Sequence, residues 1–184
     1  MQYIIGLRRS EIWGLKWEDI NFKDNTIIIN RTYCTTYENG KTVYFFSDTT
    51  KTESGYRTYP ILPVLVDRLK ELKAKQQENE KWFKNSYCQD YKGYVCVNEQ
   101  GKILNPTTVT LHFKKLAKIN GLKIIRFHGI RHSNATLQVR NGIDLREIQK
   151  WLGHSSYSST LRYAHADPSN KRISAEFMNA KFTI

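Results

Sequence analysis

The spacing of hydrophobic residues in the first third of the chain predicts a short helix followed by a small sheet. Apolar residues recur at helical spacing over residues 10–17, and polar turn residues follow them. Asn39-Gly40 is typical of a hairpin turn between two strands. We expect a three-stranded antiparallel meander from three segments rich in β-branched and aromatic residues, namely 26–33, 42–46 and 56–61.

The remaining two thirds of the chain have the pattern of helices. Leucines at helical spacing after Pro63 predict a helix that ends in the polar stretch 73–81, which we expect to be a solvent-exposed face and loop. Asn105-Pro106 predicts the start of a second helix, and Asn120-Gly121 its end. The apolar face of that helix would hold Val109, Phe113, Leu116 and Ala117.

Two further helices complete the prediction. One covers residues 128–140, and the next opens with a capping-box pattern at Asp144 and Glu147 and ends at Gly153. The fold class is therefore α+β, mostly helical, with a small three-stranded antiparallel sheet near the N-terminus.

Length and composition describe a single basic domain. The chain has 184 residues, 40% of them hydrophobic, which excludes a disordered or low-complexity segment. Its net charge of +12 makes a polyanion or an acidic surface the first partner to consider. The sequence has neither a signal peptide pattern nor an apolar run of membrane-spanning length, so we expect a cytoplasmic protein with no membrane partner. The three cysteines form no CxxC pair, and we interpret them as packing residues.

Five short stretches place cationic, histidine or tyrosine side chains beside glycine or turn residues. They are GLRRSE, TTKTESGYRT, HGIRH, LGH and LRYAH. Each taken singly has an ordinary explanation, such as a solvated helix start or a surface lysine. His128 and His132 are also spaced as metal ligands on one helix face. That reading is weak, because Gly129 stands where a Glu base would follow, Arg131 would repel a cation, and no third ligand is evident.

Taken together, the five stretches point to phosphoryl chemistry. Two arginines, a lysine and two histidines, with few carboxylates among them, suit the stabilisation of a phosphoryl transition state without a metal ion. A tyrosine hydroxyl is a weak nucleophile, but cationic neighbours and a base can activate it. Tyr163, nine residues after His154 and preceded by Arg162, is a candidate.

The order of these stretches resembles that of the tyrosine recombinases, the phage integrase family. The resemblance extends from residue 7 to about residue 165 and rests on HxxRH, LGH and a tyrosine nine residues later. It implies the mixed α/β catalytic domain that this family shares with type IB topoisomerases. It also implies cleavage of double-stranded DNA through a 3′-phosphotyrosyl link, with neither cofactor nor metal, for site-specific recombination of a mobile element.

The resemblance also assigns a role to each matching residue. Arg8 and Arg131 would bind the non-bridging oxygens of the scissile phosphate, a task that suits their planar, permanently charged groups. Lys51, between two strands, would protonate the leaving 5′ oxygen. His128 would assist proton transfer at the tyrosine, and His154 would hydrogen-bond the phosphate. Tyr163 would be the nucleophile, with Glu11 orienting the arginines and His132 a structural neighbour.

The chain departs from the family pattern at its beginning. Only seven residues precede Arg8, so we expect residues 1–184 to be a catalytic domain without its first part and without the core-binding domain. Ile4, Ile5 and Leu7 would begin a helix that lacks its packing partners. Residues 166–184 would either be exchanged with a neighbour in a DNA-bound tetramer or dock on their own core. An excisionase or another DNA-bending protein is a possible accessory partner.

Two other functions stay open at this point. A type IB topoisomerase would use the same residues to relax DNA, although the LGH histidine favours a recombinase. A non-catalytic DNA-binding relic would hold DNA by its basic face.

Overall fold

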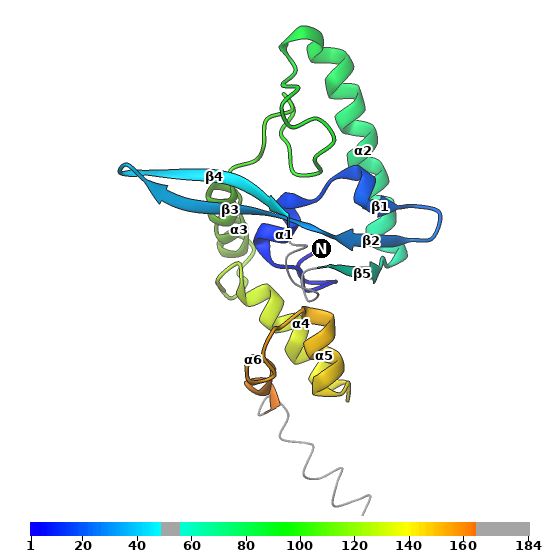
Figure 1. Cartoon of the computed structure of the whole chain (residues 1–184), viewed down its shortest axis with the longest axis vertical. Coiled ribbons are helices and arrows are strands. Elements are labelled where there is room, and N and C mark those ends of the chain that lie inside the picture. The colour runs from blue at the N-terminus through cyan, green and yellow to red at the C-terminus, as the bar shows by residue number, and fades with distance from the viewer. Residues whose placement is uncertain (49–55, 165–184) are drawn as a thin grey trace, which may run out of the picture.

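The computed structural model describes residues 1–48 and 56–164 (Figure 1). Its helices are α1 (Arg9–Gly14), α2 (Pro63–Phe83), α3 (Pro106–Ile119), α4 (Gly129–Arg140), α5 (Leu145–Leu152) and α6 (Ser158–Leu161), with 3₁₀ turns η1 (Trp17–Asp19) and η3 (Lys84–Ser86). Its strands are β1 (Ile20–Asn21), β2 (Thr26–Ile29), β3 (Arg31–Glu38), β4 (Lys41–Asp48) and β5 (Arg57–Pro60). This confirms the α+β class.

A three-stranded antiparallel sheet is present, but its strands are not the predicted three. It has the order β1-β2-β5, with Ile27 opposite Tyr59. Strands β3 and β4 form a separate two-stranded hairpin that projects from the body, with Tyr33 opposite Phe46 (Figure 1). The predicted meander is therefore wrong, because β5 pairs with β2 and not with β4.

The predicted first strand is divided at Asn30 by contacts to Asp19. The Asn30 side-chain amide donates to Asp19 Oδ1 at 2.9 Å, and the Arg31 guanidinium donates to Asp19 Oδ2 at 3.2 Å. These bonds hold the chain where β2 ends and β3 begins, so one continuous β-rich segment becomes strands of two sheets.

Helix α2 is longer than its hydrophobic pattern predicts. The stretch expected to end in a loop stays helical to Phe83. Gln76, inside that polar stretch, is buried and accepts a hydrogen bond from Trp17 Nε1 while donating to the Val95 carbonyl, both at 2.8 Å. The expected loop is therefore wrong, because the stretch is helical, whereas most of its side chains are exposed or half-buried and Gln76 is the buried one, with both of its polar groups hydrogen-bonded.

The later helices follow the prediction closely. Asn105 caps α3 by accepting from the amides of Thr107 and Thr108, although Leu116 is exposed and not part of a buried face. Helix α4 covers the predicted range. Asp144 caps α5 through the Arg146 amide, and Glu147 pairs with Lys150 at 2.8 Å in place of the capping-box contact. In the part of the chain that the structure describes, no helix is long and apolar enough to cross a membrane.

Two hydrophobic clusters form the core, and the first residues of the chain join them. Ile5 and Leu7 are buried in the larger cluster, around the sheet and α2, so the expectation of an unpartnered helix start is wrong. Trp151 Nε1 donates to the Ile5 carbonyl at 2.7 Å, and the Asn134 amide donates to the Tyr3 carbonyl at 2.8 Å. These bonds fix the N-terminal segment against α4 and α5.

Candidate active site

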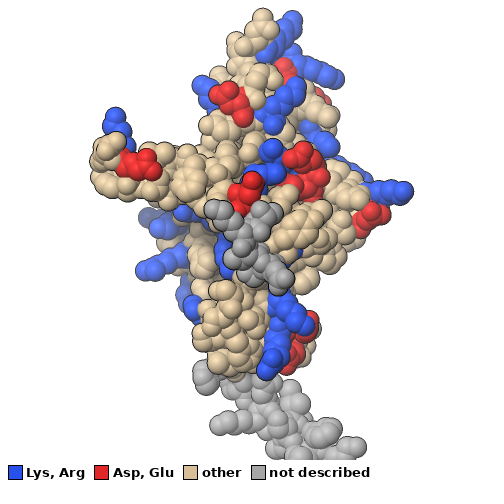
Figure 2. All heavy atoms as spheres, in the orientation of Figure 1, with Lys and Arg blue, Asp and Glu red and all other residues tan. Residues whose placement is uncertain are grey.

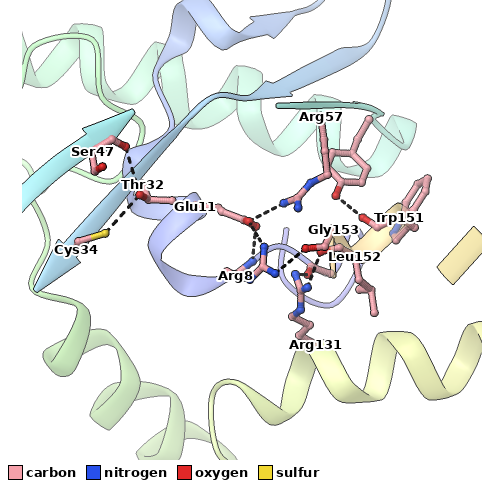
Figure 3. Close-up of polar contacts among 12 residues, drawn as sticks. Arg8, Glu11, Thr32, Cys34, Ser47, Arg57, Arg131, Trp151, Leu152 and Gly153 are labelled. Carbon is pink, nitrogen blue, oxygen red and sulfur yellow. Dashed lines mark hydrogen bonds and ion pairs between the residues drawn. The ribbon is translucent and has the colours of Figure 1, made fainter. Parts of the chain in front are cut away.

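Glu11 lies between two guanidinium groups at the start of α1 (Figure 3). Its Oε1 accepts from Arg8 Nη1 at 2.8 Å and from Arg57 Nη2 at 2.5 Å, and its Oε2 accepts from the Arg8 backbone amide at 2.7 Å. Glu11 is only 3% exposed, so the carboxylate is held in place by charge and hydrogen bonds together. This geometry connects α1 to the first residue of β5.

The C-terminal carbonyls of α5 bind the site residues from the other side. A helix ends with carbonyls that lack an intrahelical partner. The Tyr59 hydroxyl donates to Trp151, Arg131 Nη2 to Leu152 at 2.5 Å, and Arg8 Nη2 to Gly153 at 2.7 Å. Three successive carbonyls thus place two arginines side by side, and the negative end of the helix dipole favours these cations.

Arg131 is buried between the N-terminal segment and the C-terminal end of α5. It is 2% exposed, and its Nη1 donates to the Gly6 carbonyl at 2.6 Å. Burial, followed by the charge of Arg8, lowers the pKa of Arg131 to about 10, which leaves it cationic at neutral pH. Burial raises the pKa of Glu11, but Arg57 and Arg8 outweigh it and the net shift is downward. Three guanidiniums around one carboxylate leave a net positive charge suited to an anion.

Tyr163 lies among three histidines. Its hydroxyl oxygen is 2.5 Å from Nδ1 of His132, and its ring is stacked at 14° to the ring of His154, with 6.4 Å between centroids. His128 meets His132 edge to face, with centroids 5.0 Å apart. Tyr163 is 5% exposed and belongs to the smaller hydrophobic cluster, with Ala135 and the buried face of α5.

His154 is oriented by Thr160, a fully buried residue of α6. The Thr160 hydroxyl lies 2.8 Å from His154 Nδ1, which leaves Nε2 of the same ring for another partner. Burial, followed by the charges of Arg131 and Arg8, lowers the pKa of His154 to about 4. His154 is therefore neutral at physiological pH.

The structure brings most of the predicted site residues together. Arg8 and Arg131 bind adjacent carbonyls, and both lower the pKa values of His128 and His154 after burial, so the four side chains share one electrostatic environment. Tyr163, His132 and Glu11 adjoin this group. Lys51 lies outside the described residues, as do residues 166–184. Along residues 1–48 and 56–164, no group of three or more His, Cys, Asp or Glu side chains is arranged to hold a metal ion.

Comparison with known proteins identifies the family. The sequence model of the phage integrase family matches residues 1–170. This chain belongs to that family.

Curated members of the phage integrase family match almost the whole chain. A tyrosine recombinase XerC-like protein of Caldanaerobacter subterraneus subsp. tengcongensis is 33% identical over 96% of this chain and 47% of its own length. The integrase of Staphylococcus phage L54a is 26% identical over 90% of this chain and 46% of its own length. The chain thus spans about half the length of these curated relatives.

Solved structures of the phage integrase family confirm the fold. The Tn1549 transposon integrase, in complex with transposon right end DNA, has a TM-score of 0.75 at 20% identity and covers 100% of this chain and 57% of its own. The catalytic domain of bacteriophage HP1 integrase has a TM-score of 0.55 at 18% identity and covers 100% of this chain and 81% of its own.

Two residues of this integrase-family site were missed by the sequence analysis. Arg57 stands in the TTKTESGYRT stretch, but its partner Glu11 lies 46 positions earlier, and no local pattern reveals that pairing. Thr160 lies three residues before Tyr163, so a helical reading of LRYAH extended backwards would have placed both on one face. His132 was interpreted as a structural neighbour, and the structure adds its contact with the tyrosine hydroxyl.

Proposed function

We propose that this chain is the catalytic domain of a site-specific DNA recombinase that integrates or excises a mobile element. It cuts double-stranded DNA by attack of Tyr163 on a backbone phosphate, which leaves a 3′-phosphotyrosyl link and a free 5′ hydroxyl. A 5′ hydroxyl of a partner strand then attacks the link and releases the tyrosine. Bond energy is conserved, so the reaction needs no ATP, and Arg8 and Arg131 supply the positive charge that a metal ion would otherwise provide.

One observation carries this proposal. Arg8 and Arg131 are fixed on adjacent carbonyls, Gly153 and Leu152, and among the described residues Glu11 is the one buried carboxylate that accompanies them, so this part of the site has excess positive charge for a phosphate. Tyr163 adjoins that charge and contacts a histidine. A buried nucleophile beside fixed cations suits phosphoryl transfer.

The roles of the side chains follow from this reaction. Arg8 and Arg131 bind the non-bridging oxygens and stabilise the charge that develops on them. His154, neutral and held at Nδ1 by Thr160, donates from Nε2 to the phosphate. Glu11 positions Arg8, His128 assists proton transfer, and Lys51 protonates the leaving 5′ oxygen.

DNA is the proposed partner. The transposon integrase that shares this fold was solved with transposon DNA. Lys and Arg outnumber Asp and Glu by 29 to 17 in the sequence, and Figure 2 shows Lys and Arg side chains, with some Asp and Glu among them, on one face of the molecule. Phosphate contacts of this kind make binding strongly salt-dependent. We extend the proposal to a tetramer on DNA, with an accessory DNA-bending protein, in which residues 166–184 are either exchanged between neighbours or docked on their own core.

Nicked suicide DNA tests the proposed function. Duplexes taken from the flanks of the gene that encodes this chain carry a nick beside each candidate site, so the cut fragment diffuses away and the covalent protein–DNA product accumulates. We expect a denaturant-resistant adduct whose formation needs no ATP. Relaxation of supercoiled DNA without joining of separate sites would favour the topoisomerase alternative, and binding without any adduct would favour the DNA-binding relic.

A further inference from the structure

A direct contact joins Tyr163 to the second histidine of the HGIRH stretch. The Tyr163 hydroxyl oxygen lies 2.5 Å from His132 Nδ1, and the ring centroids are 5.6 Å apart. His132 belongs to α4, whereas Tyr163 follows α6, so the contact depends on tertiary packing and not on sequence proximity. The buried position of Tyr163 fixes the hydroxyl at this histidine.

We propose that His132 is a catalytic residue that accepts the phenolic proton of Tyr163 when that tyrosine attacks phosphorus. This inference rests on the proposed function, in which Tyr163 is the nucleophile. As the bond between Tyr163 Oη and phosphorus forms, the phenolic proton moves to His132 Nδ1 and the bond from phosphorus to the 5′ oxygen breaks. The leaving oxygen takes a different proton from the general acid. On rejoining, His132 returns its proton to the departing tyrosine.

The electrostatics of the pair suit this transfer. Burial, followed by the charges of Arg162 and Arg131, lowers the pKa of His132, so its ring is neutral at physiological pH and Nδ1 can carry a lone pair. Burial raises the pKa of Tyr163 despite the opposing effect of Arg162 and Arg131. The phenol therefore stays protonated at rest, and its attack requires an acceptor within hydrogen-bond distance.

The neighbouring histidines have other contacts. His154 has its Nδ1 at the Thr160 hydroxyl and stacks on the Tyr163 ring without a hydrogen bond to the phenol among the described contacts. His128 meets the His132 ring edge to face, and the described contacts give it no hydrogen bond to the phenol, so its assistance to proton transfer acts from beside His132, which takes the proton. After burial, the charges of Arg162 and Arg131 lower the pKa of His132. These neighbours disfavour a protonated His132 at rest, whereas a bound phosphate would offset their charge during the reaction.

A measurement without DNA tests the direction of the hydrogen bond. Nitrogen-15 NMR of the histidine rings distinguishes the two neutral tautomers. We expect His132 to carry its proton on Nε2 and none on Nδ1, and we expect the Nδ1 resonance to shift in Tyr163→Phe. A proton on Nδ1 in the wild-type protein would overturn the proposal, because that nitrogen would then donate to the phenol.

A kinetic test separates proton acceptance from positioning. His132→Asn keeps an oxygen that can accept a hydrogen bond from Tyr163 but removes the base, so we expect cleavage of nicked DNA to slow by about 10²- to 10⁴-fold.

Two chemical rescues identify the step that is slowed. A 5′-bridging sulfur in the DNA removes the need to protonate the leaving group. It should rescue Lys51→Ala but leave His132→Asn slow. Fluorinated tyrosine at position 163, whose phenol is more acidic, should restore much of the rate of His132→Asn.

The outcomes distinguish this proposal from the proposed function. Wild-type rates in His132→Asn, or rescue of that variant by the bridging sulfur, would overturn the role of His132 while Tyr163→Phe still abolishes the adduct. An adduct that persists in Tyr163→Phe would instead overturn the proposed function. Thermal unfolding of His132→Asn at the wild-type temperature shows that a slower rate does not come from loss of the fold.

Discussion

The guanidinium of Arg57 lies directly against the Cα of Gly153. A methyl group placed on Gly153 would come within 1.3 Å of Arg57 Nη1, which is far inside any real contact. Gly153 also has a φ of 63°, a left-handed conformation that ends α5. The glycine of the LGH stretch therefore allows the helix end, with its carbonyls, to approach the Arg57–Glu11–Arg8 group.

Gly153→Ala should disrupt the site more than backbone strain alone explains. Gly121→Ala is the matched control, since Gly121 has a φ of 64° and nothing within 4 Å of a Cβ. We expect the control to cost about 1 kcal/mol of the free energy of unfolding, and Gly153→Ala to cost about 1–3 kcal/mol more through displacement of Arg57. Urea unfolding measures both, and equal losses in the two variants would contradict the account.

Glu11→Gln should remove a buried charge that holds two arginines. We expect the free energy of unfolding at pH 7 to fall by about 3 kcal/mol, because Arg8 and Arg57 both lose the buried carboxylate with which they form ion pairs. Glu18→Gln is the control, since its side chain is 68% exposed.

The lowered pKa of Glu11 also predicts how the free energy of unfolding depends on pH. The unfolded chain binds a proton at Glu11 near the ordinary value of 4.5, while the folded chain binds it only at lower pH. This stabilisation is therefore present above pH 4.5 and is lost as the pH falls through the folded pKa. Urea unfolding across acidic pH should show a steeper loss in the wild type than in Glu11→Gln. Parallel curves would contradict the assignment.

Thr160→Val should impair cleavage through His154. The change keeps the shape of the buried side chain but removes the hydroxyl at His154 Nδ1, and the loss of one such bond corresponds to roughly a tenfold slower rate. Thr160→Ser, which keeps the hydroxyl, should cleave at a rate near that of the wild type.

NMR titration of His154 should give a pKa near 4 in the wild-type protein. A value at or above 6.5 would show that the ring is neither buried nor surrounded by cations as described.

Cleavage should continue in EDTA. The site supplies positive charge from Arg8 and Arg131, where a metalloenzyme would supply carboxylates to hold a cation. Adduct formation measured with and without EDTA should be equal. Loss of the adduct in EDTA and its return with magnesium would refute a metal-independent reaction.

The sequence predicted those parts of the fold and site that depend on local signals. Asn105, Asp144 and Gly153 mark helix ends through their own side chains or backbone, and the structure agrees with each. The sheet was misassigned because its pairing is non-local. The Asp19 carboxylate accepts hydrogen bonds from Asn30 and Arg31, and the hydrophobic pattern of residues 26–33 does not predict these contacts.

The same distinction applies to the site. The resemblance to the family predicts Arg8, Arg131, His154 and Tyr163 as site residues, and the structure places them in one region. The resemblance does not predict the hydrogen-bond partners of these side chains. The bonds from Arg8 and Arg131 to the carbonyls of α5 join residues far apart in the chain, and backbone carbonyls carry no sequence signal at all.

Identification of the residue that links to DNA tests the central claim most directly. The protein is incubated with nicked suicide DNA, the adduct is digested with protease and nuclease, and mass spectrometry locates the nucleotide-bearing peptide. The account predicts a modified Tyr163 and no adduct in Tyr163→Phe. A modification on any of the other ten tyrosines, or an undiminished adduct in Tyr163→Phe, would contradict it.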